Sequence, residues 1–338
     1  MVVKPIPTLD DVARLARVSP ATASRAINQP HRVREETRLR VEAAVSDLRY
    51  APNFGGRVLA SRRTDTFGVI IPTMENAIFA RALQTMQETM GEAGRTLLVA
   101  TSDYNADREA RQVTTLLGRG VDGLMLIGEA REPAVYAELE RRGTPCVLTW
   151  IWRPDCPWPC VGFDNRAAAR AMAALVLRYG HRRIAMIAGI TKDNDRAGER
   201  VAGVRAELDA HGLRLEPSQL IESEYTRAAG AAAAGQLLSL SSRPTAIVCG
   251  NDVLAAGAYL AARDRGLLIP GDLSITGFDD IDIAEMLDPP LTTVHIPHRR
   301  MGVAAARLLL ALRDGQPTDQ AIRFEPELIE RGSLAQAP

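Results

Sequence analysis

From residue 67 onward, short apolar runs alternate with segments whose apolar residues recur at helical spacing. The runs at 67–71, 96–100 and 123–127 are apolar almost throughout, and helical patterns at 77–94 and 106–119 separate them. Strands that are apolar on both faces are typical of parallel sheets covered by helices on both sides. This alternation predicts a doubly wound α/β fold.

The same pattern starts again after Asp164 and Asn165. A long helix is expected up to Tyr179, followed by strands at 184–188, 246–249 and 274–278 and by helices at 196–211 and 254–265. Two doubly wound halves follow from this repetition. Ligands of such folds bind where strand ends meet, so we expect a site between the halves.

The first fifty residues carry a different pattern, which predicts a small helical head. Thr8 suits the N-cap of a first helix, and Asp10 and Asp11 suit its positive end. Ser19 and Pro20 are typical of the start of a second helix. The apolar stripe expected of the first helix consists of Leu9, Val12, Ala13, Leu15 and Ala16. Together these signals indicate a helix-turn-helix.

The second helix, expected over 20–27, is built from small residues with Arg25 on one side. Small residues let a helix enter the major groove deeply, and an arginine there donates two hydrogen bonds to a guanine, a contact worth about 1–3 kcal/mol of discrimination. We therefore expect Arg25 to read a base, the alternative being a solvated surface charge. A third helix over 34–48 is expected as scaffold, although Arg34 is a poor cap.

Charge is distributed unevenly along the chain. Residues 1–63 hold twelve Lys and Arg against six Asp and Glu, whereas the remainder holds 29 against 35, so a formal net charge of zero hides a head of +6 and a body of −6. A basic head supplies phosphate contacts, and an acidic body keeps the rest of the surface off DNA.

Several short motifs in the head carry a family resemblance. They are TLDDVA at 8–13, VS at 18–19, TASRAIN at 22–28, TR at 37–38, YAPN at 50–53 and RVLA at 57–60. In this order and spacing they resemble the LacI/GalR family of bacterial transcription repressors. The resemblance implies a DNA-binding domain at 1–50 and a hinge helix or linker at 51–64 that folds on operator DNA. Leu59 would then wedge into a minor-groove step, unless it belongs to a dimer core.

The hinge departs from the family at Gly56, where alanine is usual, and Gly55 precedes it. Two glycines should make this segment less helical in isolation, so its ordering is expected to be coupled to DNA binding. The residues expected to contact DNA are Thr8, Ser19, Pro20, Ala21, Thr22, Ser24, Arg25, Asn28, Arg32, Tyr50, Asn53, Arg57 and Leu59.

The resemblance continues through the body in VGFDN at 161–165, GHRRI at 180–184, RVAG at 200–203, ND at 251–252, GFDD at 277–280 and PLTT at 290–293. It implies a periplasmic-binding-protein-like core at 65–338. Its N-subdomain would span about 65–164 and 294–323, and its C-subdomain about 165–293 and 324–338. Asp164, Asn165 and His181 are interpreted as structural.

By position, the resemblance implies polar effector contacts at Arg200, Asn251 and Asp279, and apolar or aromatic lining at Phe79, Trp150 and Tyr225. Carboxylate, amide and guanidinium groups suit the hydroxyls of a polyol, and aromatic faces cover its C–H surface. The alternatives are an interdomain ion pair for the arginine, a cap for the aspartate and core packing for the aromatic residues.

Trp150 departs from family members that place an aspartate at this position. An aromatic side chain here removes a negatively charged acceptor, while the positively charged Arg200 is retained. This change favours an anionic effector such as a sugar acid over a neutral hexose.

The interpretation is therefore a dimeric repressor that binds a palindromic operator and responds to a small effector, either an inducer or a corepressor. A sugar receptor or an α/β enzyme acting on a sugar is the alternative. The usual phosphate-binding and nucleophile-elbow glycine motifs do not occur in the sequence, which argues against an enzyme.

No cofactor or metal is expected. Cys156 and Cys160 form a CxxxC with no histidine nearby, and reduced thiols are favoured over a metal or redox site. The sequence has no run of eighteen apolar residues and no signal segment at its start, so we expect a cytosolic protein without membrane contact.

Overall fold

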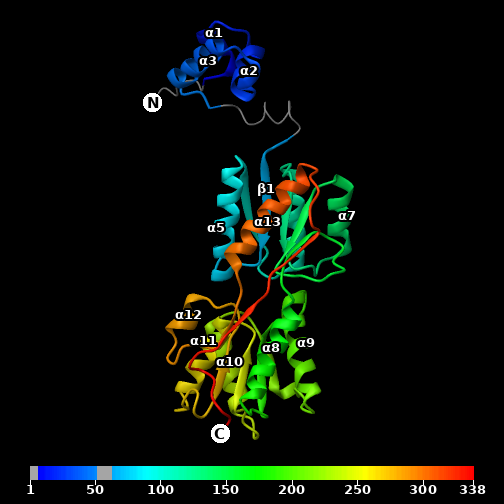
Figure 1. Ribbon diagram of the computed structural model, residues 1–338, viewed down its shortest axis with the longest axis vertical. Coiled ribbons are helices and arrows are strands. Elements are labelled where there is room, and N and C mark those ends of the chain that lie inside the picture. The colour runs from blue at the N-terminus through cyan, green and yellow to red at the C-terminus, as the bar shows by residue number, and fades with distance from the viewer. Residues whose placement is uncertain (1–6, 52–62) are drawn as a thin grey trace. The chain divides into compact units, whose positions relative to one another are not determined.

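The computed structural model describes residues 7–51 and 63–338. The chain forms two compact units, Met1–Thr64 and Asp65–Pro338, each with its own buried core (Figure 1). The first unit is called the head and the second the core domain.

The head is a three-helix unit whose starts follow the predicted caps. Its elements are α1 (Leu9–Ala16), α2 (Pro20–Asn28), the 3-10 turn η1 (Pro30–Arg32) and α3 (Glu35–Leu48). Thr8 and Asp11 form a reciprocal capping box at α1, and Ser19 caps α2 by accepting from the Thr22 amide at 3.1 Å. These caps satisfy amides that have no partner within the helix.

The predicted apolar stripe of α1 is wrong at Leu15, whose side chain is half exposed. The buried residues of α1 are Val12, Ala13 and Ala16. At about 100° per residue, Leu15 lies roughly 110° from the centre of that stripe, so it turns away from the core of the head.

The core domain contains a six-stranded parallel sheet in the order β11-β5-β4-β3-β1-β2. Its strands are β1 (Thr66–Ile71), β2 (Thr96–Thr101), β3 (Leu124–Ile127), β4 (Cys146–Thr149), β5 (Cys160–Gly162) and β11 (Ala321–Arg323). Its helices are α5 (Ala77–Glu92), α6 (Ala106–Gly118), α7 (Pro133–Arg142) and α13 (His298–Arg313).

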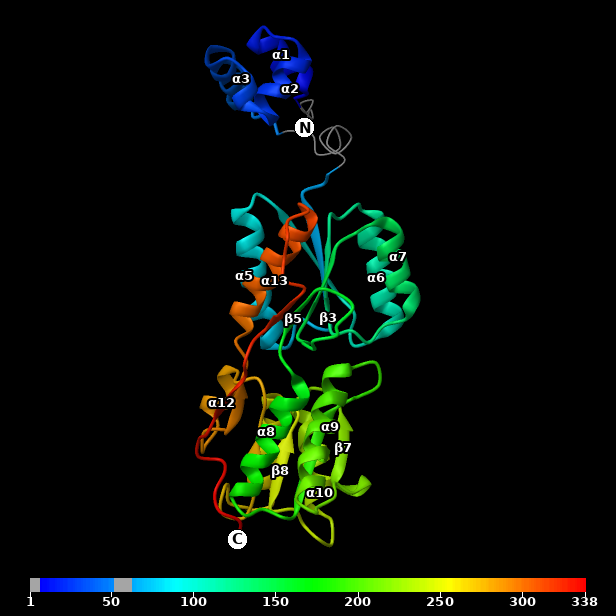
Figure 2. The ribbon, with the colours of Figure 1, turned by 45° about the vertical axis from the view of Figure 1, so that its right-hand side comes forward.

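Both faces of β1 and β3 are covered, as their apolar runs predicted. The prediction is wrong for β2, which lies at the edge of the sheet and is only partly buried. Val69 and Met125 join the apolar cluster under α5 and α13, whereas the adjacent Ile70 and Leu124 join the cluster under α6 and α7. Figure 2 shows the two helix pairs on opposite sides of the sheet. Because successive strand side chains point to opposite faces, a strand buried on both sides must be apolar at every position.

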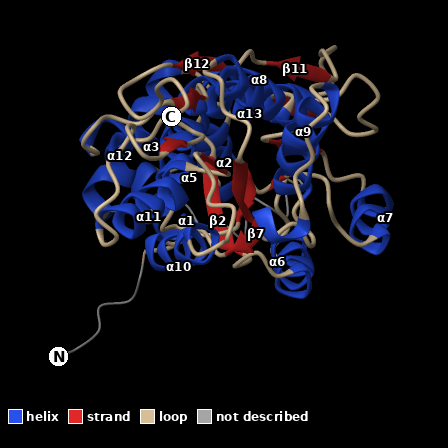
Figure 3. Ribbon diagram, turned by 90° about the horizontal axis from the view of Figure 1, so that it is seen from below, coloured by secondary structure: helices blue, strands red, loops and turns tan. Residues whose placement is uncertain are grey.

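A second parallel sheet, in the order β7-β6-β8-β9, forms the other lobe of the core domain. Its strands are β6 (Ile184–Gly189), β7 (Leu220–Ser223), β8 (Ala246–Cys249) and β9 (Ser274–Thr276). Its helices are α8 (Asn165–Arg178), α9 (Asp195–Ala210), α10 (Arg227–Leu238), α11 (Asp252–Arg263) and α12 (Asp282–Met286), with the 3-10 turn η2 (Pro217–Gln219). Helices α8 and α9 contribute to one apolar cluster, and α10 and α11 to the other (Figure 3).

The chain crosses between the lobes at three places in the core domain. The crossings lie at 162–165, at 292–298 and at 323–327, and the last two carry the antiparallel strands β10 (Thr293–His295) and β12 (Glu327–Ile329). The phenylalanine rings of Phe163 and Phe278 stack 6.1 Å apart beside these crossings. The lobes therefore share one continuous apolar cluster.

His181 packs as expected rather than facing a site. It is fully buried, and its ring nitrogens contact the hydroxyls of Thr245 and Ser274 and the carbonyl of Ala335 at 3.0–3.1 Å. Burial lowers the pKa of this imidazole, so it stays neutral near pH 7. Across residues 7–51 and 63–338, no helix is long and apolar enough to span a membrane.

Two glycines of α9 provide a matched test of the packing between α8 and α9. A Cβ at Gly203 would collide with the Arg166 carbonyl, whereas a Cβ at Gly198 would meet nothing within 4 Å. We expect Gly203→Ala to lower stability by about 1–3 kcal/mol through overpacking, and Gly198→Ala to raise it by about 0.5–1 kcal/mol. Urea unfolding of the full chain measures both, and equal effects would contradict this packing.

Candidate functional site

The outer face of α2 carries the residues predicted to contact DNA. Ala23 and Ala26 pack into the core of the head, while Ala21, Arg25 and Asn28 are exposed. This separation of faces is what a helix needs to enter a groove while anchored from behind.

Most polar groups on this face already have partners within the head. The Ser19 and Thr22 hydroxyls lie 2.9 Å apart, and the Asn28 amide donates to the Ser24 carbonyl at 2.9 Å. The side chains of Arg25 and Arg32 form no hydrogen bond or ion pair with the described residues. Their guanidinium groups therefore remain available to a partner.

Four other predicted DNA contacts lie after the last helix of the head. Tyr50 is only 9% exposed and packs in the core of the head, so its DNA contact stays a prediction. Asn53, Arg57 and Leu59 lie outside the described residues, and their roles stay predictions too.

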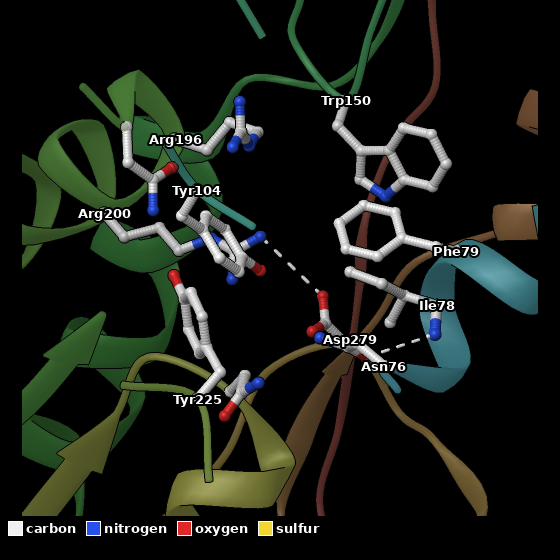
Figure 4. A pocket seen from close by; sticks show the side chains of 11 residues that line it. Asn76, Ile78, Phe79, Tyr104, Trp150, Arg196, Arg200, Tyr225 and Asp279 are labelled. Atoms are coloured by element: carbon white, nitrogen blue, oxygen red, sulfur yellow. Dashed lines mark hydrogen bonds and ion pairs between the residues drawn. The ribbon is translucent and has the colours of Figure 1, made fainter. Parts of the chain in front are cut away.

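The core domain has a pocket between its lobes (Figure 4). Its lining residues are Asn76, Ile78, Phe79, Tyr104, Trp150, Asn194, Arg196, Arg200, Tyr225, Asn251 and Asp279. All six residues predicted as effector contacts belong to this set. The structure thus brings together side chains that are up to two hundred residues apart in sequence.

Three asparagines of the pocket start helices. Asn76 caps α5, Asn194 caps α9 and Asn251 caps α11, each accepting a hydrogen bond from an amide of the first turn. The three helix N-termini therefore meet at the pocket. Their amides and dipoles make this region electropositive, which favours acceptor groups or an anion.

Arg200 is almost fully buried and is held on several sides. Its Nε donates to Asn165 Oδ1 at 2.9 Å, and its Nη1 donates to the Gly250 carbonyl at 2.7 Å. Its guanidinium carbon lies 3.7 Å from the centre of the Phe278 ring. The remaining nitrogen, Nη2, is 3.7 Å from Asp279 Oδ1, which is an ion pair too long for a hydrogen bond.

Asp279 places in the pocket a buried acceptor atom that receives no hydrogen bond from the described residues. Its carboxylate is buried, and among the described residues Oδ1 has no hydrogen-bond donor. Burial raises the pKa of this carboxyl to about 6, although Arg200 and Arg81 oppose the shift. A ligand hydroxyl or N–H would relieve this cost, which points to a donor on the ligand.

Aromatic rings line both walls of the pocket. Phe79 and Trp150 meet edge to face at 5.4 Å. Tyr104, which follows β2 of the six-stranded sheet, and Tyr225, which follows β7 of the other lobe, lie 5.5 Å apart. A Cβ at Gly189 would overlap the Tyr225 ring, so this glycine makes room for the tyrosine. The rings leave flat apolar faces for the C–H surface of a ligand.

Three lining residues adopt backbone angles that non-glycine residues rarely take. The φ angle is +52° at Tyr104, +61° at Trp150 and +104° at Asp279. Such conformations cost about 1–3 kcal/mol each. They persist where surrounding contacts hold the backbone in place, often at sites that bind a ligand.

Five lining residues were missed by the sequence analysis: Asn76, Ile78, Tyr104, Asn194 and Arg196. A usable signal was present, because these residues follow the carboxyl ends of β1, β2 and β6. Ligands of parallel sheets bind at those ends. Four of the five, all except the apolar Ile78, are polar or aromatic residues a short way beyond a predicted strand.

The cysteines lie elsewhere. Cys146, Cys160 and Cys249 are buried and Cys156 is partly buried, all four as free thiols. Among the described residues, no group of three or more His, Cys, Asp or Glu side chains is arranged to hold a metal ion.

Two family models match the chain in the order in which its parts occur. Residues 8–53 match the model of bacterial regulatory proteins, lacI family, and residues 173–334 match the model of a periplasmic binding protein-like domain. The chain is 34% identical over 332 residues to the HTH-type transcriptional repressor CytR of Escherichia coli strain K12, which covers 98% of this chain and 97% of that protein. The chain belongs to the LacI family. It is a DNA-binding transcriptional regulator.

Other members of the LacI family support the same assignment. Catabolite control protein A of Priestia megaterium is 34% identical over 324 residues, covering 96% of this chain and 97% of that protein. A LacI family regulator from Silicibacter pomeroyi has a TM-score of 0.87 at 27% identity, covering 97% of this chain and 99% of that one.

The lac repressor dimer bound to operator and an anti-inducer has a TM-score of 0.86 at 27% identity, covering 98% of this chain and all of that one. A cellobiose complex of the regulator CelR has a TM-score of 0.72 at 30% identity, covering 97% and 99% of the two chains. The predicted family and fold class are confirmed. The relatives are named as repressors rather than enzymes.

The raised pKa of Asp279 predicts a specific pH dependence. Between its ordinary value of 3.8 and about 6, the folded protein binds a proton that the unfolded chain does not, so stability falls as pH rises through this range. By linkage the loss is about 3 kcal/mol. We expect Asp279→Asn to melt above the wild type at pH 8 and alongside it near pH 4.

Thermal unfolding across pH 4–8 measures this difference. Asp264→Asn, which changes an exposed carboxylate at the end of α11, is the matched control and should keep the wild-type pH dependence. An Asp279→Asn variant that melts below the wild type at pH 8 would show that its carboxylate stabilises the fold instead.

Proposed function

We propose that this regulator is a repressor whose operator affinity is set by a small polyhydroxylated acid bound between the lobes of its core domain. The observation that carries this proposal is the buried, donorless Asp279 facing Arg200 among aromatic walls. A binding site that lacks a donor for its own carboxylate is incomplete without a ligand.

The lining side chains specify the chemistry of the effector. Asp279 calls for a hydroxyl or N–H donor, whereas Arg196 and Arg200 supply guanidinium groups that suit a carboxylate. Trp150 replaces an acceptor with an apolar ring, and its indole N–H is already used by His298. A sugar acid satisfies these features together, and the cellobiose complex of CelR supports the carbohydrate class.

Contacts across the cleft connect ligand binding to lobe orientation. The Glu129 amide donates to Asp195 Oδ2 at 2.6 Å, and Arg81 of α5 donates to the Asp280 carbonyl at 3.2 Å and pairs with Asp282. An effector that engages both lobes changes the balance of these contacts. Coupling of this kind typically changes the free energy of binding at the second site, here the binding of operator DNA, by about 1–3 kcal/mol.

On the DNA side, the protein acts as a homodimer on a palindromic operator. The two heads reach successive major grooves, with Arg25 of each head reading a guanine, and the two Leu59 side chains enter the central minor groove. The lac repressor dimer on its operator supports this arrangement. The chromosome is the site of action, which places the protein in the cytoplasm.

The effector class is tested by calorimetry on the full chain. We expect D-gluconate to bind more tightly than D-glucose, because only the acid engages the pocket guanidinium groups. Arg200→Lys should reduce gluconate affinity at least tenfold, since a single ammonium group cannot hold Asn165 and the Gly250 carbonyl and also present a donor to the pocket. Tighter binding of glucose than of gluconate would overturn the sugar-acid proposal while leaving the DNA role intact.

The reading role of Arg25 is tested on an operator selected from random palindromic DNA. Arg25→Ala should cost about 1–3 kcal/mol per half-site and relax specificity at one base pair. Arg40→Ala on α3, which also removes an exposed arginine, is the matched control and should weaken all sequences alike. If both variants keep the wild-type base preference, Arg25 does not read a base.

A further inference from the structure

We propose that Asn165 is a positioning residue that holds the aromatic wall and the arginine of the pocket in one arrangement. It rests on the proposed function, because it assigns a role to a side chain that supports that pocket without lining it. Asn165 is the first residue of α8, at the first crossing between the lobes, and is 5% exposed.

The amide of Asn165 joins residues from both lobes. Its Nδ2 donates to the carbonyl of Trp150, which follows β4, at 2.9 Å. Its Oδ1 accepts from Nε of Arg200, which lies on α9, also at 2.9 Å. One buried side chain therefore connects the wall of one lobe to the cation of the other.

The orientation of this amide is fixed by chemistry. A guanidinium group only donates hydrogen bonds, so the atom facing Arg200 must be the oxygen. The NH₂ group then faces the Trp150 carbonyl, which only accepts. No other residue of similar size offers a donor and an acceptor in this geometry. A flipped amide would place its NH₂ group against the donors of Arg200 and its oxygen against the carbonyl of Trp150.

The bond to Trp150 supports a backbone conformation that tryptophan rarely adopts. Its φ is +61°, its amide donates to the Val161 carbonyl at 3.1 Å, and its indole Nε1 donates to His298 Nδ1 at 3.2 Å. Burial lowers the pKa of His298 to about 3, so its ring stays neutral and accepts this bond. Removing the Asn165 donor leaves the Trp150 carbonyl without the hydrogen bond that it receives among the described residues.

The bond to Arg200 decides which nitrogen faces the ligand. With Nε on Asn165 and Nη1 on the Gly250 carbonyl, the planar fork turns Nη2 toward Asp279 and the pocket. Asn165 thus sets the direction of the guanidinium group as well as the position of the indole ring. A change at either contact reaches the other through a single rigid amide.

The first test reads Trp150 directly. In a Trp152→Phe, Trp158→Phe background, Trp150 is the single tryptophan of the chain, so a ¹⁵N-tryptophan sample gives one indole N–H signal. We expect Asn165→Ala and Asn165→Asp each to shift this signal upfield and to raise acrylamide quenching at least twofold. Asn165→Asp keeps the size and the acceptor for Arg200 but loses the donor, so it carries the test if Asn165→Ala does not fold.

Asp164→Ala is the matched control. Asp164 caps the same helix by accepting from the Ala167 amide at 2.9 Å, but it has no contact with Trp150 or Arg200. We expect it to lower the melting temperature and to leave the indole signal in place. A wild-type indole signal in both Asn165 variants, or an equal shift in Asp164→Ala, would overturn the proposal.

A second test measures ligand affinity with D-gluconate as the probe. Asn165→Ala should weaken gluconate binding at least tenfold, and Asp164→Ala should leave it within twofold of the wild type. Unchanged affinity in Asn165→Ala would contradict the positioning of Arg200. If gluconate fails to bind the wild type, the sugar-acid proposal fails, and the indole signal still decides the role of Asn165.

Discussion

The cleft is organised by one buried cation. A guanidinium group removed from water is costly unless it has polar partners. Arg200 has partners on three separate segments of the chain: it donates hydrogen bonds to two of them and forms an ion pair with the third. Those partners are the start of α8, the loop after β8 and the loop after β9. The positions of Asn165, Gly250 and Asp279 are therefore mutually dependent, and so is the shape of the pocket that they surround.

Much of this fold is predictable because its signals are local. Strands buried on both faces must be apolar throughout, and α1 and α2 start where Thr8 and Ser19 can cap them. Helix α10 was missed because it is built almost wholly of small apolar residues and has no amphipathic stripe; Gly230 lets it pack against the backbone of α11. Strand β11 was missed because it has three residues and pairs with β5, far back in the chain.

The candidate site was predictable by a different route. The six expected lining residues came from family resemblance, and no periodicity in the sequence would have placed Phe79 beside Trp150 or Arg200 beside Asp279. Neither sequence patterns nor family resemblance predicts that Asn165 connects the two lobes, because in the sequence it looks like an ordinary residue at the start of a helix. Its function depends on a carbonyl fifteen residues before it and a guanidinium thirty-five residues after it.

The three crossings between the lobes limit how a ligand can act. A protein joined by one linker can separate its lobes freely, but a triple connection permits twisting or rocking about the crossings and resists translation. Two of the crossings lie late in the sequence: one leads from β10 into α13 of the first lobe, and the other leads from β11 to β12. We therefore expect effectors of different chemistry to act through the same kind of motion, a rotation of one lobe about these crossings.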